Sequence, residues 1–114
     1  MQFGVLEKGE SIKTTDQLVR LQYKNNGKLV VEKRTNLESQ WEVTWSKPDG
    51  NGNEGGKAEI RINGNLVVSD ADGKVVWNSG TGSQENKYSK LVLKDNGTLQ
   101  IVNMNQEVTW RSNN

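Results

Sequence analysis

The chain of 114 residues contains no cysteine, no histidine and a single proline. Without cysteine and histidine it has no thiolate nucleophile, no Ser-His-Asp triad, no disulfide and no zinc site of the usual nitrogen and sulfur ligands. These absences exclude most hydrolytic and redox chemistry, so we expect no catalytic residues, no metal and no cofactor. Lack of cysteine fits a reducing compartment, but secreted proteins without disulfides exist, so composition assigns no compartment.

The chain also lacks a large net charge and long apolar stretches. The 15 Lys and Arg residues oppose 14 Asp and Glu residues, which leaves a net charge of +1, and no basic cluster stands out. Non-specific nucleic-acid binding depends on such clusters, so nucleic acid is not expected as a partner. No stretch approaches the ~20 apolar residues of a membrane span, and residues 1–10 lack a signal-peptide pattern. We therefore expect a soluble protein without membrane insertion or a visible targeting signal.

Turn-forming residues are abundant instead. The chain contains 14 Asn and 12 Gly, whereas only 32% of it is hydrophobic. Such a composition suits many short strands joined by tight turns, and no segment shows a 3.6-residue apolar period over helical length. Domains commonly have about 100–150 residues, so the length allows one hydrophobic core. The sequence predicts a single all-β domain over residues 1–114.

An Asn-Gly dipeptide recurs three times between stretches of alternating apolar residues. The three glycines, Gly27, Gly64 and Gly97, lie 37 and 33 residues apart. Each repeat ends on a tryptophan, in order Trp45, Trp77 and Trp110. Asn-Gly in this setting is a strong hairpin signal and predicts a type I′ turn. We place the internal repeats at about residues 16–46, 57–80 and 88–112.

Alternation assigns the two faces of each hairpin, since successive side chains of a strand point to opposite sides. The residues expected to point inward are Leu91, Leu93, Leu99 and Ile101 in the third repeat, and Ile60, Ile62, Leu66, Val68, Val75 and Trp77 in the second. One small sheet cannot bury its apolar face alone, whereas three sheets around an axis can, with the three tryptophans as core residues between them. The pattern predicts pseudo-threefold symmetry, as a triangular prism or a β-trefoil.

One stretch of the second repeat reads Asn63-Gly-Asn-Leu-Val-Val-Ser-Asp-Ala-Asp-Gly-Lys-Val-Val-Trp77-Asn-Ser-Gly-Thr81. It resembles the repeat of the bulb-type lectins, the monocot mannose-binding family. The segment Met1 to Ser11 is similar to the opening strand of that family, and the resemblance extends over the whole chain. It implies a β-prism II of three four-stranded antiparallel sheets. It also implies a lectin without catalysis, with mannose or a related glycan as a weakly bound partner.

In that family each repeat carries a sugar site with the pattern Q-x-D-x-N-x-V-x-Y, whose five side chains share the face opposite the core. The matching positions are Arg61, Asn63, Asn65, Val67 and Ser69 in the second repeat, Lys24, Asn26, Lys28, Val30 and Glu32 in the first, and Lys94, Asn96, Thr98, Gln100 and Val102 in the third. A long cation replaces Gln and Asn replaces Asp in every repeat, and the Tyr is lost. The second repeat is the best-preserved site, and its ligand is expected to be a hexose or an acidic glycan.

The same residues admit other interpretations. In one alternative interpretation, the three Asn-Gly pairs only form turns and bind no sugar. A prism that has lost sugar binding would be an interaction or structural domain, and a third possibility is a cell-surface targeting module of a toxin or bacteriocin. Trp41 has no counterpart in the other repeats and is a candidate exposed surface for stacking a sugar. Family members often exchange C-terminal strands, so the resemblance allows a homodimer through residues 107–114.

Overall fold

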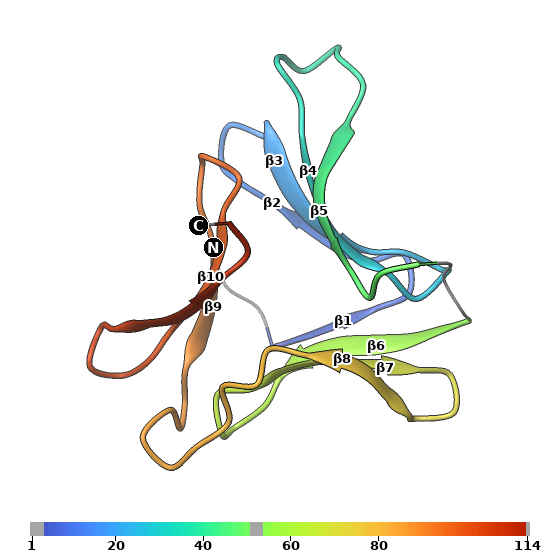
Figure 1. Cartoon of the computed structure of the whole chain (residues 1–114). Helices are drawn as coiled ribbons and strands as arrows, with labels where there is room; N and C mark the ends of the chain where they lie inside the picture. Colours follow the sequence, from blue (N-terminus) through green and yellow to red (C-terminus); the bar gives the residue numbers. More distant parts are fainter. Residues whose placement is uncertain (1–3, 51–53, 114) are drawn as a thin grey trace.

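The computed structural model describes residues 4–50 and 54–113. All regular secondary structure in these ranges consists of β-strands. The strands are β1 (Val5–Glu7), β2 (Ser11–Lys13), β3 (Val19–Tyr23), β4 (Leu29–Lys33), β5 (Glu42–Lys47), β6 (Gly55–Ile60), β7 (Leu66–Asp70), β8 (Val75–Asn78), β9 (Lys90–Leu93), β10 (Leu99–Val102) and β11 (Val108–Arg111). Within these ranges there is no helix long and apolar enough to cross a membrane. Figure 1 shows the strands as three sheets around a common centre, like the faces of a prism.

Each repeat contributes three consecutive antiparallel strands. Sheet A has the order β1-β6-β7-β8, sheet B the order β2-β3-β4-β5 and sheet C the order β11-β10-β9. The all-β prism is confirmed, but among the described residues the third sheet has three strands and not the expected four. The N-terminal segment supplies only two outer strands, since β1 pairs with β6 and β2 pairs with β3. No other described strand pairs with β9 on its outer side.

The core lies where the inward faces of the three sheets meet. Its buried side chains are Leu6, Val19, Leu21, Tyr23, Leu29, Val31, Ala58, Leu66, Val68, Leu91, Leu93, Leu99 and Ile101. Two inward expectations are wrong. Ile62 is 69% exposed because it lies in the turn between β6 and β7, and Val75 is 41% exposed because a β-bulge at Val68/Ser69 shifts the pairing with β8.

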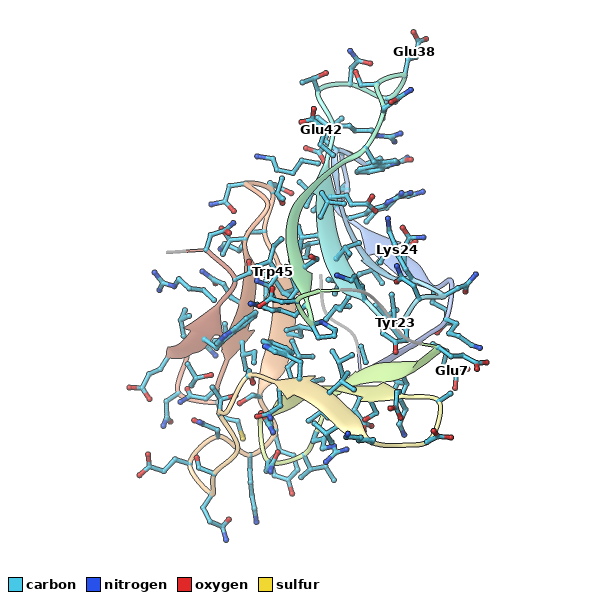
Figure 2. The ribbon with its side chains drawn as sticks, turned by 45° about the vertical axis from the view of Figure 1, so that its right-hand side comes forward. Glu7, Tyr23, Lys24, Glu38, Glu42 and Trp45 are labelled. Atoms are coloured by element: carbon cyan, nitrogen blue, oxygen red, sulfur yellow. The ribbon has the colours of Figure 1, made fainter. Side chains whose placement is uncertain are left out.

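The three tryptophans that end the repeats contact one another between the sheets. The ring centroids of Trp45, Trp77 and Trp110 are 5.6–5.7 Å apart, and the ring planes meet at 62–74°. This edge-to-face geometry is favoured by the quadrupoles of the rings. Each ring is half-buried and packs against the core. The expected central role of the three rings is confirmed, and Figure 2 shows Trp45 between the sheets.

The Asn-Gly turns differ from the expected type. In the second repeat, the Gly64 N–H donates to the Arg61 carbonyl at 2.9 Å, and the Arg61 N–H donates to the Asn65 carbonyl at 2.8 Å. Gly64 has φ +88°, whereas Asn63 does not have a positive φ. This is a type I turn followed by a left-handed glycine, and not a type I′ turn. The Asn63 Oδ1 accepts the Asn65 N–H at 3.1 Å, which stabilises this geometry. The same turn recurs at Gly27 and Gly97.

A buried tyrosine connects sheets A and B. The hydroxyl of Tyr23, on β3, donates to the Ser69 carbonyl on β7 at 3.1 Å and accepts the Gly56 N–H of β6 at 2.9 Å. The side chain is fully buried. Burial raises the pKa of Tyr23 above its ordinary value of 10.0, because the phenolate would lose its hydration. The tyrosine therefore stabilises the contact between two sheets only while it is protonated.

We expect alkaline pH to weaken the fold through Tyr23. Its pKa is higher in the folded than in the unfolded state, so the stability that it contributes is complete below about pH 10 and is lost as the pH rises further. Urea denaturation between about pH 8 and about pH 11 should show this decline. Tyr23→Phe should remove this part of the decline and cost about 1–3 kcal/mol, because the Gly56 N–H loses its acceptor. The exposed Tyr88 provides the matched control Tyr88→Phe. An unchanged pH profile in Tyr23→Phe would contradict the assignment.

Candidate functional site

The outward faces of the three sheets share one arrangement of cations. Each repeat has two long cationic side chains four residues apart, on its first strand or directly after it. The residue midway between them points to the same face of the sheet. These sets are Arg20, Gln22 and Lys24 on sheet B, Lys57, Glu59 and Arg61 on sheet A, and Lys90, Val92 and Lys94 on sheet C. The second cation of each set was predicted from the family pattern. The first cation and the middle residue were missed, although the two-residue alternation that located the core also locates them.

Sheet A carries the best-preserved site, around a carboxylate. The Arg61 Nε donates to Glu59 Oε1 at 3.1 Å, and the Lys57 Nζ lies 3.7 Å from Glu59 Oε2. These three side chains and Ser69 line an open hollow of about 430 Å³. Of the five residues predicted for this repeat, Arg61 and Ser69 therefore lie at the hollow.

The other three predicted residues of this repeat, Asn63, Asn65 and Val67, do not line the hollow. Val67 is opposite Glu59 on the adjacent strand and is only 1% exposed. The Asn65 Oδ1 accepts the Ser79 hydroxyl and the Gly80 N–H, both at 3.0 Å. These bonds fix the amide group, and no described residue accepts from the Asn65 Nδ2. Asn63 only forms the turn described above. Asn65 thus combines a structural role with a free donor.

Sheet B carries a network of ion pairs at the matching place. Glu32 is buried, with 3% exposure, and its Oε1 accepts the Arg20 Nε at 2.7 Å. The Lys24 Nζ lies 3.7 Å from Glu32 Oε2, and Figure 2 shows Lys24 on the outer side of this sheet. Val30 is buried beside this network, and the Asn26 Oδ1 accepts the Lys28 N–H at 3.1 Å. The five predicted residues lie along the β3–β4 hairpin. Lys24 and Glu32 belong to the ion-pair network, and Lys24 and Asn26 line an open hollow of about 370 Å³.

On the outward face of sheet C none of the five predicted residues is buried. Gln100 and Val102 are half-buried on β10, and Lys94 is exposed at the end of β9. Asn96 forms the turn, since its Oδ1 accepts the Thr98 N–H at 2.9 Å. The structure therefore groups Lys94, Gln100 and Val102 on one surface and places Asn96 and Thr98 at its end.

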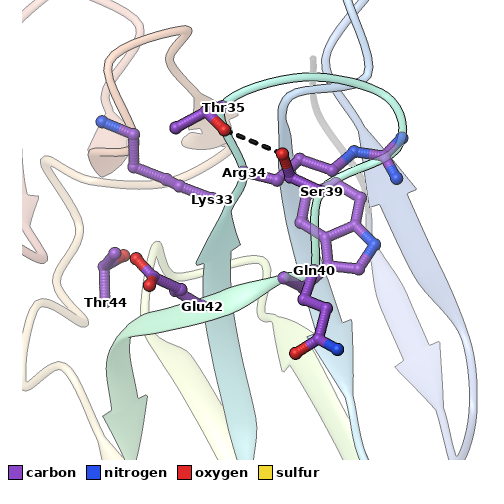
Figure 3. Close-up of a pocket in the computed structure, with 8 residues that line it drawn as sticks. Lys33, Arg34, Thr35, Ser39, Gln40, Glu42 and Thr44 are labelled. Carbon is purple, nitrogen blue, oxygen red and sulfur yellow. Dashed lines mark hydrogen bonds between the residues drawn. The ribbon is translucent and has the colours of Figure 1, made fainter.

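The long hairpin between β4 and β5 forms a separate hollow of about 530 Å³, shown in Figure 3. Trp41 lies there, half-buried, with the guanidinium carbon of Arg20 at 4.3 Å and that of Arg34 at 4.1 Å from its ring centroid. Trp41 therefore holds two arginines by cation–π contacts. Because the ring also lines the hollow, its role in stacking a sugar stays a prediction.

No group of three or more metal-ligating side chains occurs in residues 4–50 and 54–113. The chemistry available on the three faces consists of hydrogen-bond donors from cations and amides, a few carboxylate acceptors and valine methyl groups. Such surfaces can bind polar ligands in shallow contacts.

One curated relative matches part of the chain. A mannose-specific lectin of Aloe arborescens is 39% identical over 46 residues, which are 40% of this chain and 42% of that protein. The chain thus matches about two fifths of the length of this relative. No family model matches the sequence.

Solved lectin structures match nearly the whole chain. The Japanese Marasmius oreades lectin has a TM-score of 0.79 at 18% identity, covering 99% of this chain and 88% of its own. A monomeric monocot mannose-binding lectin from Gastrodia elata has a TM-score of 0.71 at 18% identity, covering 97% and 96%. A domain-swapped lectin dimer from Mycobacterium smegmatis has a TM-score of 0.50 at 29% identity, covering 94% and 91%. The shared prism fold and the local sequence match together show that this chain is similar to bulb-type lectins.

Proposed function

We propose that the protein is a carbohydrate-binding lectin without catalysis, with its main neutral-sugar site on the outward face of sheet A. The observation that carries this proposal is the open hollow of about 430 Å³ lined by Arg61, Glu59 and Ser69. Only this repeat keeps both the second Asn and the Val of the family pattern, as Asn65 and Val67. The names of the relatives, which include mannose-specific and mannose-binding lectins, support the same class of ligand.

The groups around this hollow complement a hexose. Within the hollow the Arg61 guanidinium offers donors to hydroxyl oxygens and Glu59 offers an acceptor. The Asn65 amide, which does not line the hollow, offers a further donor next to Arg61 across the hairpin. Because Glu59 already pairs with Arg61, a sugar hydroxyl competes with an existing bond, which limits the gain in free energy. A shallow site of this kind typically binds in the millimolar range, about −4 kcal/mol, and multivalent presentation raises the avidity.

The critical test is Asn65→Asp with methyl α-mannoside, followed by isothermal titration calorimetry or NMR titration. The substitution keeps an oxygen that accepts from the loop at Ser79 and Gly80, but it removes the donor Nδ2. We expect binding to weaken about tenfold, as for the loss of one hydrogen bond of about 1.4 kcal/mol. Asn96→Asp makes the same change at an exposed turn of sheet C and should leave the affinity unchanged. Equal affinity of Asn65→Asp and the wild type would exclude sheet A as the site.

The buried network on sheet B favours loss of sugar binding at the first repeat. Arg20 and Lys24 occupy the face where a ligand would lie, and Glu32 stands where the family has its tyrosine. If all three repeats had lost sugar binding, the prism would be an interaction or structural domain. A glycan array on which the wild type binds nothing would select this alternative.

Exchange of the C-terminal segment between two copies stays a proposal. In the structure β11 pairs with β10 of its own chain, so the hydrogen bonds between these two strands form within one monomer. The domain-swapped relative from Mycobacterium smegmatis supports the possibility of exchange.

A further inference from the structure

We propose that the outward face of sheet C binds an anionic sugar, a uronate or a sulfated residue, whose acidic group lies between Lys90, Lys94 and Arg111. The proposal rests on the proposed lectin function and names the ligand class of one of its three faces. The proposed site is not the sugar site of the family pattern. Lys94 stands where that pattern has Gln, and Lys90 and Arg111 lie outside the pattern.

Sheets A and B show what the repeated pair of cations does. On sheet A, Lys57 and Arg61 both reach the carboxylate of Glu59, at 3.7 and 3.1 Å. On sheet B, Arg20 and Lys24 both reach the carboxylate of Glu32, at 2.7 and 3.7 Å. The two carboxylates come from different strands, Glu59 from β6 and Glu32 from β4. In each group one carboxylate thus offsets one of the two positive charges, and the two cations converge on that one anionic group.

Sheet C has the same two cations without a carboxylate. Lys90 and Lys94 occupy the positions of Lys57 and Arg61, but Val92 stands where sheet A has Glu59. Lys90 pairs across the strands with Val102, just as Arg20 pairs with Glu32 on sheet B. Both positions that supply the counter-charge elsewhere are thus valines on this sheet.

A third cation increases the charge of this face. Arg111 on β11 is opposite Gln100, which in turn is opposite Val92. Neighbouring strands are about 4.8 Å apart, so Arg111 lies about 10 Å from Val92 along this row. Lys90, Lys94 and Arg111 are all exposed, and among the described residues none of them forms an ion pair. The three cations surround Gln100 and the two valines.

The carboxylates nearest in sequence lie in turns at the ends of the sheet. Asp95 is within the turn of residues 94–98, and Glu107 closes the turn of residues 103–107. Glu107 accepts the Asn103 Nδ2 at 3.1 Å. Neither carboxylate forms an ion pair with a described cation, so the centre of the face keeps its positive charge.

An anionic sugar complements each part of this surface. Its carboxylate or sulfate takes the place of the missing glutamate, which relieves the repulsion between the cations. The half-buried methyl groups of Val92 and Val102 can contact the C–H groups of the sugar ring, and the Gln100 amide can bond its hydroxyls. Because the cations are exposed, the binding should weaken as salt concentration rises.

The test compares an oligogalacturonate tetramer with its uncharged methyl ester, which keeps the sugar rings and their hydroxyls but removes the negative charges. The wild type should bind the acid form at least tenfold more tightly than the ester. Val92→Glu installs the carboxylate of sheet A and should weaken binding of the acid form at least tenfold. Gln22→Glu adds the same charge at the equivalent position of sheet B, and it should change the affinity less than twofold. The exposed pair Lys90→Gln and Lys94→Gln should reproduce the loss if Val92→Glu fails to fold. A heparin-derived tetrasaccharide tests sulfate as the acidic group.

Binding of methyl α-mannoside separates this inference from the general function. If the mannoside binds but neither acidic oligosaccharide exceeds the ester, the anionic site is overturned and the lectin proposal stands. If the acid form binds and both Val92→Glu and Gln22→Glu weaken it equally, the binding is diffuse charge attraction and the assignment to sheet C is overturned. If no saccharide binds, both proposals fail.

Discussion

Replacing Trp77 by alanine is expected to lower the free energy of unfolding by about 3–5 kcal/mol, the usual cost of removing a large aromatic side chain from a core. The ring contacts both other central tryptophans, with centroids at 5.7 and 5.6 Å. It also packs against the core cluster. Its loss therefore removes contacts between all three sheets at once. Since domains of this size are stable by about 5–15 kcal/mol, a large part of the stability depends on one ring.

Trp41→Ala is the matched control for this experiment. Its ring lies in the β4–β5 hairpin, outside the central cluster, and contacts the guanidinium groups of two half-buried arginines, Arg20 and Arg34. Each such cation–π contact contributes about 0.5–1 kcal/mol, so we expect a loss of about 1–2 kcal/mol. Urea denaturation monitored by far-ultraviolet circular dichroism measures both variants without relying on the fluorescence of the removed ring. Equal losses for Trp77→Ala and Trp41→Ala would contradict the central role of the three rings.

The sequence predicts the threefold arrangement of sheets well because three independent signals agree, and the family resemblance then selects the prism over the β-trefoil. Asn-Gly dipeptides, alternating apolar residues and terminal tryptophans recur in the same order in each repeat, and the structure places them in three equivalent sheets. The errors occur where backbone geometry is irregular. Val75 is exposed because a bulge at Val68 reverses the alternation, and alternation alone contains no information about a bulge. Among the described residues the third sheet has three strands and not four, since β1 and β2 pair with the other two sheets.

The candidate site is less predictable, because it depends on contacts between side chains that are distant in sequence. The family pattern identifies Arg61 and Ser69 at the hollow of sheet A, but it includes Asn63, whose side chain serves the turn. It gives no indication that Glu59 pairs with Arg61. The cations at the first pattern position become interpretable only when each is seen with a second cation on the same strand, such as Lys57.

Gly64→Ala is expected to destabilise the protein by about 2–5 kcal/mol through two additive effects. Gly64 has φ +88°, a left-handed conformation that costs a residue with a side chain about 1–2 kcal/mol. In addition, a Cβ atom at this position would overlap the Asn86 carbonyl oxygen and approach the Asn86 Cβ at 2.7 Å and the Ser89 Oγ at 2.9 Å. Overpacking of this kind adds about 1–3 kcal/mol. The loop of residues 83–89 must therefore move away from the turn of the second repeat.

Gly73→Ala separates the two effects, because this glycine closes a turn of the same type on the same sheet. Its φ is +82°, and no atom of the described residues lies within 4 Å of where a Cβ would be. Only the conformational cost of about 1–2 kcal/mol is then expected. Thermal and urea denaturation of both variants should show the larger loss for Gly64→Ala. Equal losses would mean that the loop of residues 83–89 yields freely, and that the close contact between Gly64 and Asn86 adds no strain when a methyl group is introduced.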